Sequence, residues 1–118
     1  MIIIGLFGGL GAVSRYALGN YISKYNKTSF PYGTFLINII GSMLLGITNH
    51  FYRDRIISAD IWLFLGVGFL GAFTTFSTFS FEAIQLFMSK KYIIAIFYVL
   101  LSTILCILSA YLGLNIFT

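Results

Sequence analysis

The sequence predicts an all-α membrane protein with four transmembrane helices, and three observations support this fold class. Hydrophobic residues make up 59% of the 118 and charged residues only 8%, whereas a water-soluble domain carries about 25% charged residues. Four apolar stretches, separated by short polar segments, are each long enough for a bilayer crossing of about 20 residues. In the third stretch, glycines followed by threonines predict a break near the middle of the helix. We therefore expect a single transmembrane domain that covers residues 1–118.

The first predicted helix covers residues 2–24 and the second covers residues 31–52, after the polar segment KYNKTS. Pro31 suits the first turn of its helix, because the N–H that it lacks would have no intrahelical partner there. Arg15 lies inside the first helix, where a charge costs roughly 2.5–3.5 kcal/mol at the bilayer centre. It either reaches the headgroups or lines a vestibule that attracts an anion. Asn38 lies inside the second helix with two amide donors and an acceptor, and it either bonds to another helix or faces a ligand.

Small residues four positions apart predict close contacts between helices. Such pairs occur in each of the first three predicted helices: Gly5 with Gly9, Ser42 with Gly46, and Gly68 with Ala72. They favour tight packing and an oligomer, and they say little about chemistry.

The third predicted helix covers residues 61–88, after the polar segment RDRIISAD, and its helix propensity is weakest near the middle. Glycine is the most helix-averse residue after proline, and β-branched threonine loses side-chain freedom in a helix. The residues concerned are Gly66, Gly68, Gly71, Thr74 and Thr75. Non-helical backbone at membrane depth occurs only where it is buried in protein or lines a cavity, and its freed carbonyls can coordinate a cation.

Phenylalanines alternate with hydroxyl side chains directly after this break. Phe76 and Phe79 are three positions apart and share a helix face, and Ser77, Thr78 and Ser80 lie between and beside them. Aromatic residues at this spacing usually pack in a core. An aromatic ring is positive at its edge, however, so ring edges combined with hydroxyl donors also suit a small anion. Spacing alone leaves both interpretations open.

The fourth predicted helix covers residues 92–116, after the polar segment SKK. Tyr98, Ser102 and Ser109 share one of its faces. A serine in a membrane helix usually bonds to the carbonyls of its own helix, whereas a stripe of hydroxyls suggests a polar path. Cys106 is the one cysteine, which excludes an internal disulfide.

The net charge of +4 indicates membrane anchoring rather than a nucleic-acid partner, because the basic residues flank the apolar stretches. They are Lys24, Lys27, Arg53, Arg55, Lys90 and Lys91. Their distribution between the loops is only weakly biased, which permits insertion in both orientations and antiparallel pairing of identical chains. The sequence has no carboxylate cluster, nucleophile–base pair or phosphate-binding loop, so the polar residues favour anion passage over enzymatic catalysis.

Three longer segments carry a family signal: GGLGAVSRY in the first helix, PYGTFLINIIGSMLLG in the second, and GFLGAFTTFSTFSFE in the third. Together they closely resemble the CrcB/Fluc family of fluoride channels, and the match covers nearly the whole chain. The resemblance implies an antiparallel dual-topology dimer in the plasma membrane, with two fluoride-selective pores at its interface. Such a channel exports cytoplasmic fluoride passively and lowers its toxicity. The partner is either an identical chain or a paired homologue.

The resemblance also implies roles for residues along the fluoride path. Phe76 and Phe79 look like the phenylalanine box of the family, and Asn38 looks like its pore-lining asparagine. The hydroxyls that resemble the polar track are those of Ser77, Thr78, Tyr98 and Ser102.

Further implied roles lie beside the pore. Arg15 and Glu82 resemble the charged residues of the vestibule, and the backbone carbonyls of Gly71 and Thr74 match positions that hold a structural sodium ion at the dimer interface. Cys106 departs from the family pattern, because it stands where a hydroxyl of the polar track is expected and a thiol is a weaker donor.

The strongest alternative is a small multidrug-resistance transporter, which is also a four-helix antiparallel dimer of about this length. Its coupling chemistry needs a glutamate embedded in the first helix. Here that helix carries Arg15 and no acidic residue, which argues against proton-coupled export.

Overall fold

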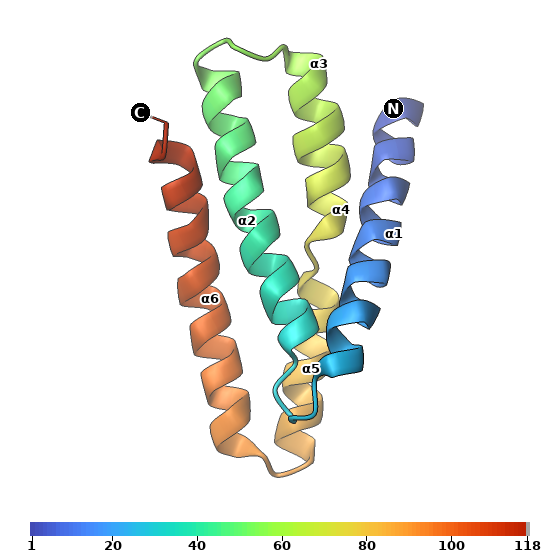
Figure 1. The fold of residues 1–118 in the computed structure, drawn as a ribbon, viewed down its shortest axis with the longest axis vertical. Coiled ribbons are helices and arrows are strands. Elements are labelled where there is room, and N and C mark those ends of the chain that lie inside the picture. The colour runs from blue at the N-terminus through green and yellow to red at the C-terminus, as the bar shows by residue number, and fades with distance from the viewer. Residues whose placement is uncertain (118) are drawn as a thin grey trace.

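The structure is a computed structural model that describes residues 1–117. These residues contain four helical spans that run side by side along the long axis (Figure 1). The spans are α1 (Ile2–Tyr25), α2 (Tyr32–Arg53), a third span from Ala59 to Met88, and α6 (Tyr92–Asn115). Each is long and apolar enough to cross a membrane, so the predicted four-helix class is confirmed. The molecule is 48 Å long, similar to the roughly 40–45 Å of a bilayer with its headgroups.

The third span is interrupted, as the sequence predicts. It consists of α3 (Ala59–Ile61), the π-helix η1 (Trp62–Leu70), α4 (Gly71–Phe73) and α5 (Phe76–Met88). Between α4 and α5, Thr74 and Thr75 are extended, with ψ angles of 156° and 119°. The glycines contribute elsewhere: the indole of Trp62 lies against Gly66 within η1, where a β-carbon would collide with the ring. The β-branched threonines therefore mark the break itself.

The main chains of α2 and α6 come into direct contact at two glycines. A β-carbon at Gly46 would overlap the carbonyl oxygen of Ala110, and one at Gly113 would overlap the carbonyl oxygen of Met43. Gly46 belongs to a small-residue pair that the sequence singled out, and Gly113 does not. This contact fixes the distance between the two helices that later contribute facing rows of polar side chains.

The helix α1 packs against the upper part of the third span. Gly11 lies against the main chain of Phe69, so no larger residue fits there. The predicted pair Gly5 and Gly9 makes no such contact, because nothing lies within 4 Å of a β-carbon placed on either residue. That face of α1 is not used for packing within one chain.

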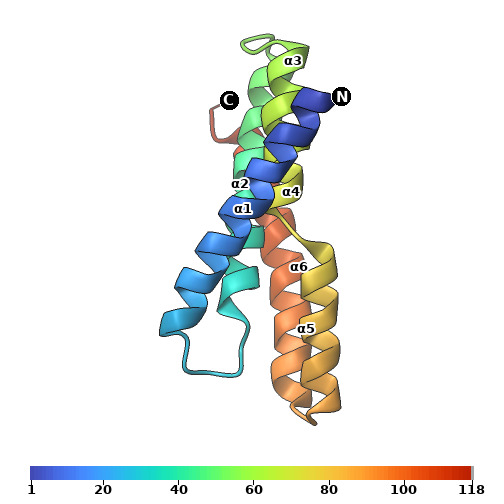
Figure 2. The same cartoon turned by 90° about the vertical axis from the view of Figure 1, so that its right-hand side faces the viewer.

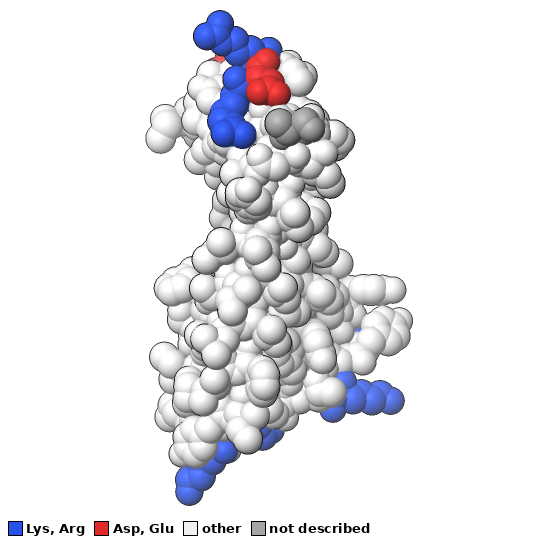
Figure 3. Space-filling model, turned by 90° about the vertical axis from the view of Figure 1, so that its left-hand side faces the viewer, with Lys and Arg blue, Asp and Glu red and all other residues white. Residues whose placement is uncertain are grey.

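Below the break, α5 lies alongside α6, whereas the end of α1 diverges from both (Figure 2). A buried cluster joins the two helices and contains Ala83 and Leu86 of α5 with Ala95 and Tyr98 of α6. On the face that Figure 3 shows, most Lys and Arg side chains lie at the two ends of the molecule. The distribution suits a protein whose ends meet the headgroups and whose middle lies in hydrocarbon.

Candidate functional site

Asn38 of α2 binds the main chain at the break. Its Nδ2 donates to the carbonyl oxygen of Thr75 at 3.0 Å, and its Oδ1 accepts from the N–H of Thr75 at 2.8 Å. Of the two interpretations of Asn38, the bond to another helix is therefore present. One N–H of the amide is left over from this pairing for another acceptor. The side chain thus satisfies the two main-chain groups that an extended residue exposes at membrane depth.

Thr75 also starts the lower half of the span. Its Oγ1 accepts from the N–H of Thr78 at 3.3 Å, which caps the N-terminus of α5. The same hydroxyl donates to Oγ1 of Thr78 at 3.2 Å and lies 3.5 Å from Oγ of Ser77. Hydroxyls that the family resemblance assigns to a polar track are thus linked to the break.

A pocket of about 340 Å³ opens on one side of the pair formed by Asn38 and Thr75. Four of the predicted pore residues line it: Asn38, Phe76, Phe79 and Ser102. The rings of Phe76 and Phe79 are 5.9 Å apart, and the ring of Phe76 is 78% exposed. Oγ of Ser102 is buried and makes no hydrogen bond within residues 1–117. The pocket therefore combines phenyl rings with unused hydrogen-bond donors.

A second pocket of about 250 Å³ contains the two predicted vestibule residues, Arg15 and Glu82, together with Thr78. The hydroxyl of Thr34 also lines it and donates to the carboxylate of Glu82. Nε of Arg15 is buried and has no hydrogen-bond partner in the part of the chain that the structure describes. Thr75 lines both pockets, so the two meet at the break.

Tyr98 lies between the residues of the two pockets. It is fully buried, and its ring packs 5.0 Å from that of Phe79 and 5.4 Å from that of Phe30. Its hydroxyl makes no hydrogen bond among the described residues, and the polar side chains beside it are Thr34 and Glu82. Tyr98 therefore connects the phenylalanines of one pocket with the carboxylate of the other. Ser77, by contrast, is exposed and lines neither of these two pockets.

The predicted sodium ligands, Gly71 and Thr74, lie at the carbonyl end of the upper half of the third span. The hydroxyl of Thr74 bonds to the Leu70 carbonyl at 3.2 Å and lies 3.5 Å from that of Gly71. Gly71 is exposed in the single chain. The last carbonyls of a helix lack intrahelical partners and carry partial negative charge. Residues 1–117 contain no group of three His, Cys, Asp or Glu side chains that could hold a metal.

Sequence patterns did not identify three groups of the site as ligands or hydrogen-bond partners. These are the side chains of Thr34 and Ser42 and the main chain of Thr75. Thr34, Asn38 and Ser42 follow one another at four-residue steps, so they form a polar row along α2. Ser42 and Cys106 of α6 line the same pocket and their side chains are neighbours. The four-residue spacing on α2 was the available signal, and it matches the row of Tyr98, Ser102 and Cys106 on α6.

The sequence matches the model of one protein family over most of its length. The model described as CrcB-like protein, Camphor Resistance (CrcB), matches residues 2–114. The chain belongs to the CrcB family. Its pockets, break and polar rows are thus those of a CrcB protein.

Curated relatives of this CrcB chain extend over almost its full length. A protein of Clostridium acetobutylicum named fluoride-specific ion channel FluC 2 is 46% identical over 111 residues, which cover 94% of this chain and 92% of that protein. A FluC 2 of Bacillus cereus with the same description is 44% identical over 115 residues, covering 98% and 94%. The fluoride-specific ion channel FluC of Geotalea daltonii is 41% identical over 114 residues, covering 96% and 92%.

Proposed function

We propose that this chain forms a fluoride-selective channel, through which cytoplasmic fluoride leaves the cell down its electrochemical gradient. The observation that carries the proposal is the pocket at the break, where Phe76 and Phe79 lie beside the donors of Asn38 and Ser102. Fluoride is small, tightly hydrated and a strong hydrogen-bond acceptor. A selective pore must replace its water with donors at close quarters, just as potassium filters replace water with carbonyls. Relatives at 41–46% identity are named fluoride-specific ion channels, which supports the same reading.

The residues suggest an order along the path. Arg15 supplies positive charge in the pocket that also holds Glu82 and Thr34. Tyr98 follows, with its hydroxyl beside that carboxylate and its ring against Phe79. An inside-negative potential, worth about 2.3 kcal/mol per charge for each 100 mV, drives the anion outward without a pump. The plasma membrane is the location where this export lowers fluoride toxicity.

A second chain completes the pore in this proposal. Phe76 is 78% exposed in the single chain, so another surface is needed to enclose a pore on that side of its ring. An antiparallel dimer would supply that surface and give two pores at its interface. This chain keeps Asn38, Phe76 and Phe79, so a homodimer would contain two full sets of pore residues. A heterodimer with a paired homologue is the alternative assembly.

The carbonyl end at Gly71 and Thr74 fits a sodium ion between two such copies. Sodium is a hard cation that prefers oxygen ligands, and the helix end supplies carbonyl oxygens with partial negative charge. The hydroxyl of Thr74 lies 3.5 Å from the Gly71 carbonyl oxygen, which is a long hydrogen bond, so that carbonyl is weakly engaged by this side chain. When bound, the cation would neutralise the two facing helix ends. Gly71 and Thr74 of each copy would hold it.

Fluoride efflux from liposomes tests the proposal directly. The purified chain, reconstituted alone into vesicles loaded with potassium fluoride, should release fluoride when valinomycin provides a path for potassium. A fluoride electrode measures the rate, and vesicles loaded with chloride provide the selectivity control. No proton gradient should be needed, which separates a channel from a small multidrug-resistance transporter. Absent efflux, or chloride release at the same rate, would contradict the proposal.

Replacing Phe79 with isoleucine should slow fluoride efflux by roughly 2- to 10-fold, because an aromatic edge contact contributes about 0.5–1.5 kcal/mol. The ring lies at the meeting point of Phe76 and Tyr98, and isoleucine keeps the apolar bulk without the ring edge. The matched control is Phe87→Ile on the same helix, because Phe87 lines neither pocket at the break. Size-exclusion chromatography should show unchanged assembly of both variants. Equal efflux from the two would remove the ring from its assigned role.

A further inference from the structure

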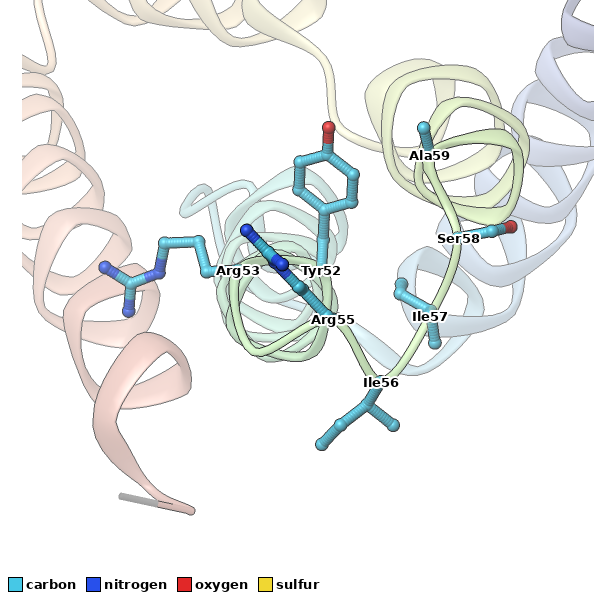
Figure 4. A pocket seen from close by; sticks show the side chains of 7 residues that line it. All are labelled: Tyr52, Arg53, Arg55, Ile56, Ile57, Ser58 and Ala59. Atoms are coloured by element: carbon cyan, nitrogen blue, oxygen red, sulfur yellow. The ribbon is translucent and has the colours of Figure 1, made fainter.

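The loop between α2 and α3 encloses a pocket of about 560 Å³ at the end of the molecule far from α5. Tyr52, Arg53 and Arg55 line it together with Ile56 and Ser58 (Figure 4). In this view Arg53 extends toward α6, and Arg55 lies over the end of α2 and points back toward Tyr52. The three side chains line the same pocket, although Arg53 extends away from the other two in this view.

The backbone holds Arg55 in a conformation that a residue with a side chain rarely adopts. Its φ is 61°, its N–H bonds to the carbonyl of Tyr52 at 3.1 Å, and the N–H of Ile56 bonds to that of Phe51 at 2.9 Å. These two bonds form the Schellman turn that ends a helix, where glycine is the usual residue. An arginine here keeps a sterically disfavoured backbone, and it directs its side chain back over the helix end. Strain at such a position is a reason to look for a ligand.

Neither arginine of this pocket is paired with a carboxylate among the described residues, although Asp54 and Asp60 lie nearby in the sequence. Nε2 of His50, in the last turn of α2, lies 3.2 Å from Oδ2 of Asp54. Asp54 is therefore engaged with α2. Guanidinium groups bind phosphate oxygens in a bidentate manner, which makes a phosphate the natural complement.

The opposite end of the chain differs in this respect. Lys90 forms the same type of turn, with φ of 63°. The pocket beside it, however, contains Glu82, and Nζ of Lys91 donates to Oγ of Ser29 at 2.6 Å. That end is also basic, with Lys24, Lys27, Lys90 and Lys91, and it differs in that one of its ammonium groups is hydrogen-bonded within the chain.

Aromatic and apolar groups place the arginine pocket at headgroup depth. The ring of Tyr52 stacks on the indole of Trp62 with centroids 5.7 Å apart and planes at 22°, and Tyr and Trp favour the membrane interface. Ile56, at the tip of the loop, is 67% exposed, which suits contact with lipid better than contact with water.

We propose that this pocket binds the headgroup phosphate of an anionic phospholipid, with Arg53 and Arg55 on the phosphate oxygens and Tyr52 beside the glycerol. The phosphate comes from the lipid because the pocket lies where headgroups lie. The site is independent of ion conduction, since none of its residues lines a pocket at the break. Binding at this site would enrich anionic lipid over zwitterionic lipid around the loop.

Trp62 makes the proposal measurable, because it is the one tryptophan of the chain and stacks on a pocket residue. The full chain is reconstituted into vesicles of phosphatidylcholine and phosphatidylglycerol in equal amounts, with bromine atoms in the acyl chains of one lipid or the other. Brominated phosphatidylglycerol should quench Trp62 more strongly, with an apparent local preference of about fivefold or more, as expected for one to two arginines near anionic lipid. Equal quenching by the two lipids would overturn the proposal.

Variants of the two arginines test whether the lipid preference depends on their charge. The double variant R53Q/R55Q should lose the preference, and R53K/R55K should keep most of it. The matched control K24Q/K27Q removes two cations at the other end of the chain and should leave the preference unchanged. Loss in all three variants, or in none, would contradict the assignment to the arginine pocket. In detergent, millimolar inorganic phosphate should leave Trp62 fluorescence unchanged; a saturable change abolished in R53Q/R55Q would identify free phosphate, not lipid, as the ligand.

Discussion

Replacing Asn38 with alanine should loosen the break in the third span and lower fluoride efflux by at least about tenfold. The variant leaves the N–H and the carbonyl of Thr75 without the partners that hold them at 2.8 and 3.0 Å. A buried polar group without a partner costs about 1–3 kcal/mol, so losing both bonds should cost about 2–5 kcal/mol of stability. The pocket also loses the amide N–H that could face the anion. Thermal unfolding in detergent and liposome efflux measure the two effects.

Two further variants test whether the loss of the hydrogen bonds to Thr75 causes these effects. Asn38→Leu keeps the volume of the side chain and removes the bonds, so it should behave like the alanine variant. Asn115→Ala deletes an amide that, within residues 1–117, donates to the Tyr111 carbonyl of its own helix at 2.8 Å, and it should change little. Stability and efflux of Asn38→Ala that match those of Asn115→Ala would show that the pairing with Thr75 has no such role.

Gly113→Ala should separate α2 from α6 and strongly destabilise the protein. The added β-carbon would overlap the carbonyl oxygen of Met43 and lie 3.0 Å from the backbone nitrogen of Ile47. Backbone cannot move aside as a side chain can, so the helices must part along the rows that carry Asn38 and Ser102. Overpacking of this kind costs about 1–3 kcal/mol, and loss of the folded protein is the extreme outcome. The temperature at which half of the protein remains monodisperse in detergent measures the effect.

Gly9→Ala is the matched control for this clash. Nothing lies within 4 Å of its added β-carbon in the chain, and alanine is a better helix former than glycine by about 1 kcal/mol. The control should therefore be as stable as the original protein or slightly more stable. Gly46→Ala meets the same helix contact from the other side, so combining it with Gly113→Ala should give less than the sum of the two effects. A Gly113→Ala variant as stable as Gly9→Ala would contradict the close contact.

Much of the fold follows from the sequence because lipid imposes strong rules. Hydrocarbon requires about 20 apolar residues per helix, so composition and spacing gave four spans. The break was also predictable, since Thr74 and Thr75 are poor helix formers beside Gly71. The glycines predicted the position of the break less well than the threonines did. Gly66, for example, makes room for the ring of Trp62 and does not interrupt the helix.

The site was less accessible to prediction because its decisive contacts join distant parts of the chain. Asn38 bonds to Thr75, 37 residues away, and Thr34 bonds to Glu82, 48 residues away. A single sequence shows that an amide needs a partner and does not show which helix supplies it. Gly113 escaped for a similar reason, because its need for a small residue comes from Met43 on another helix. The roles of these residues in conduction stay predictions that the efflux experiments test.

Asn38 leaves the ribosome 37 residues before Thr75, because chains are synthesised from the N-terminus. The whole of α2 (Tyr32–Arg53) is therefore synthesised before the break. An extended residue at membrane depth has no water to bond with. The extended conformation of Thr75 is therefore favourable only once its main chain is hydrogen-bonded to Asn38. The threonines set the position of the bend, and the second helix supplies the partner that stabilises it within the bilayer.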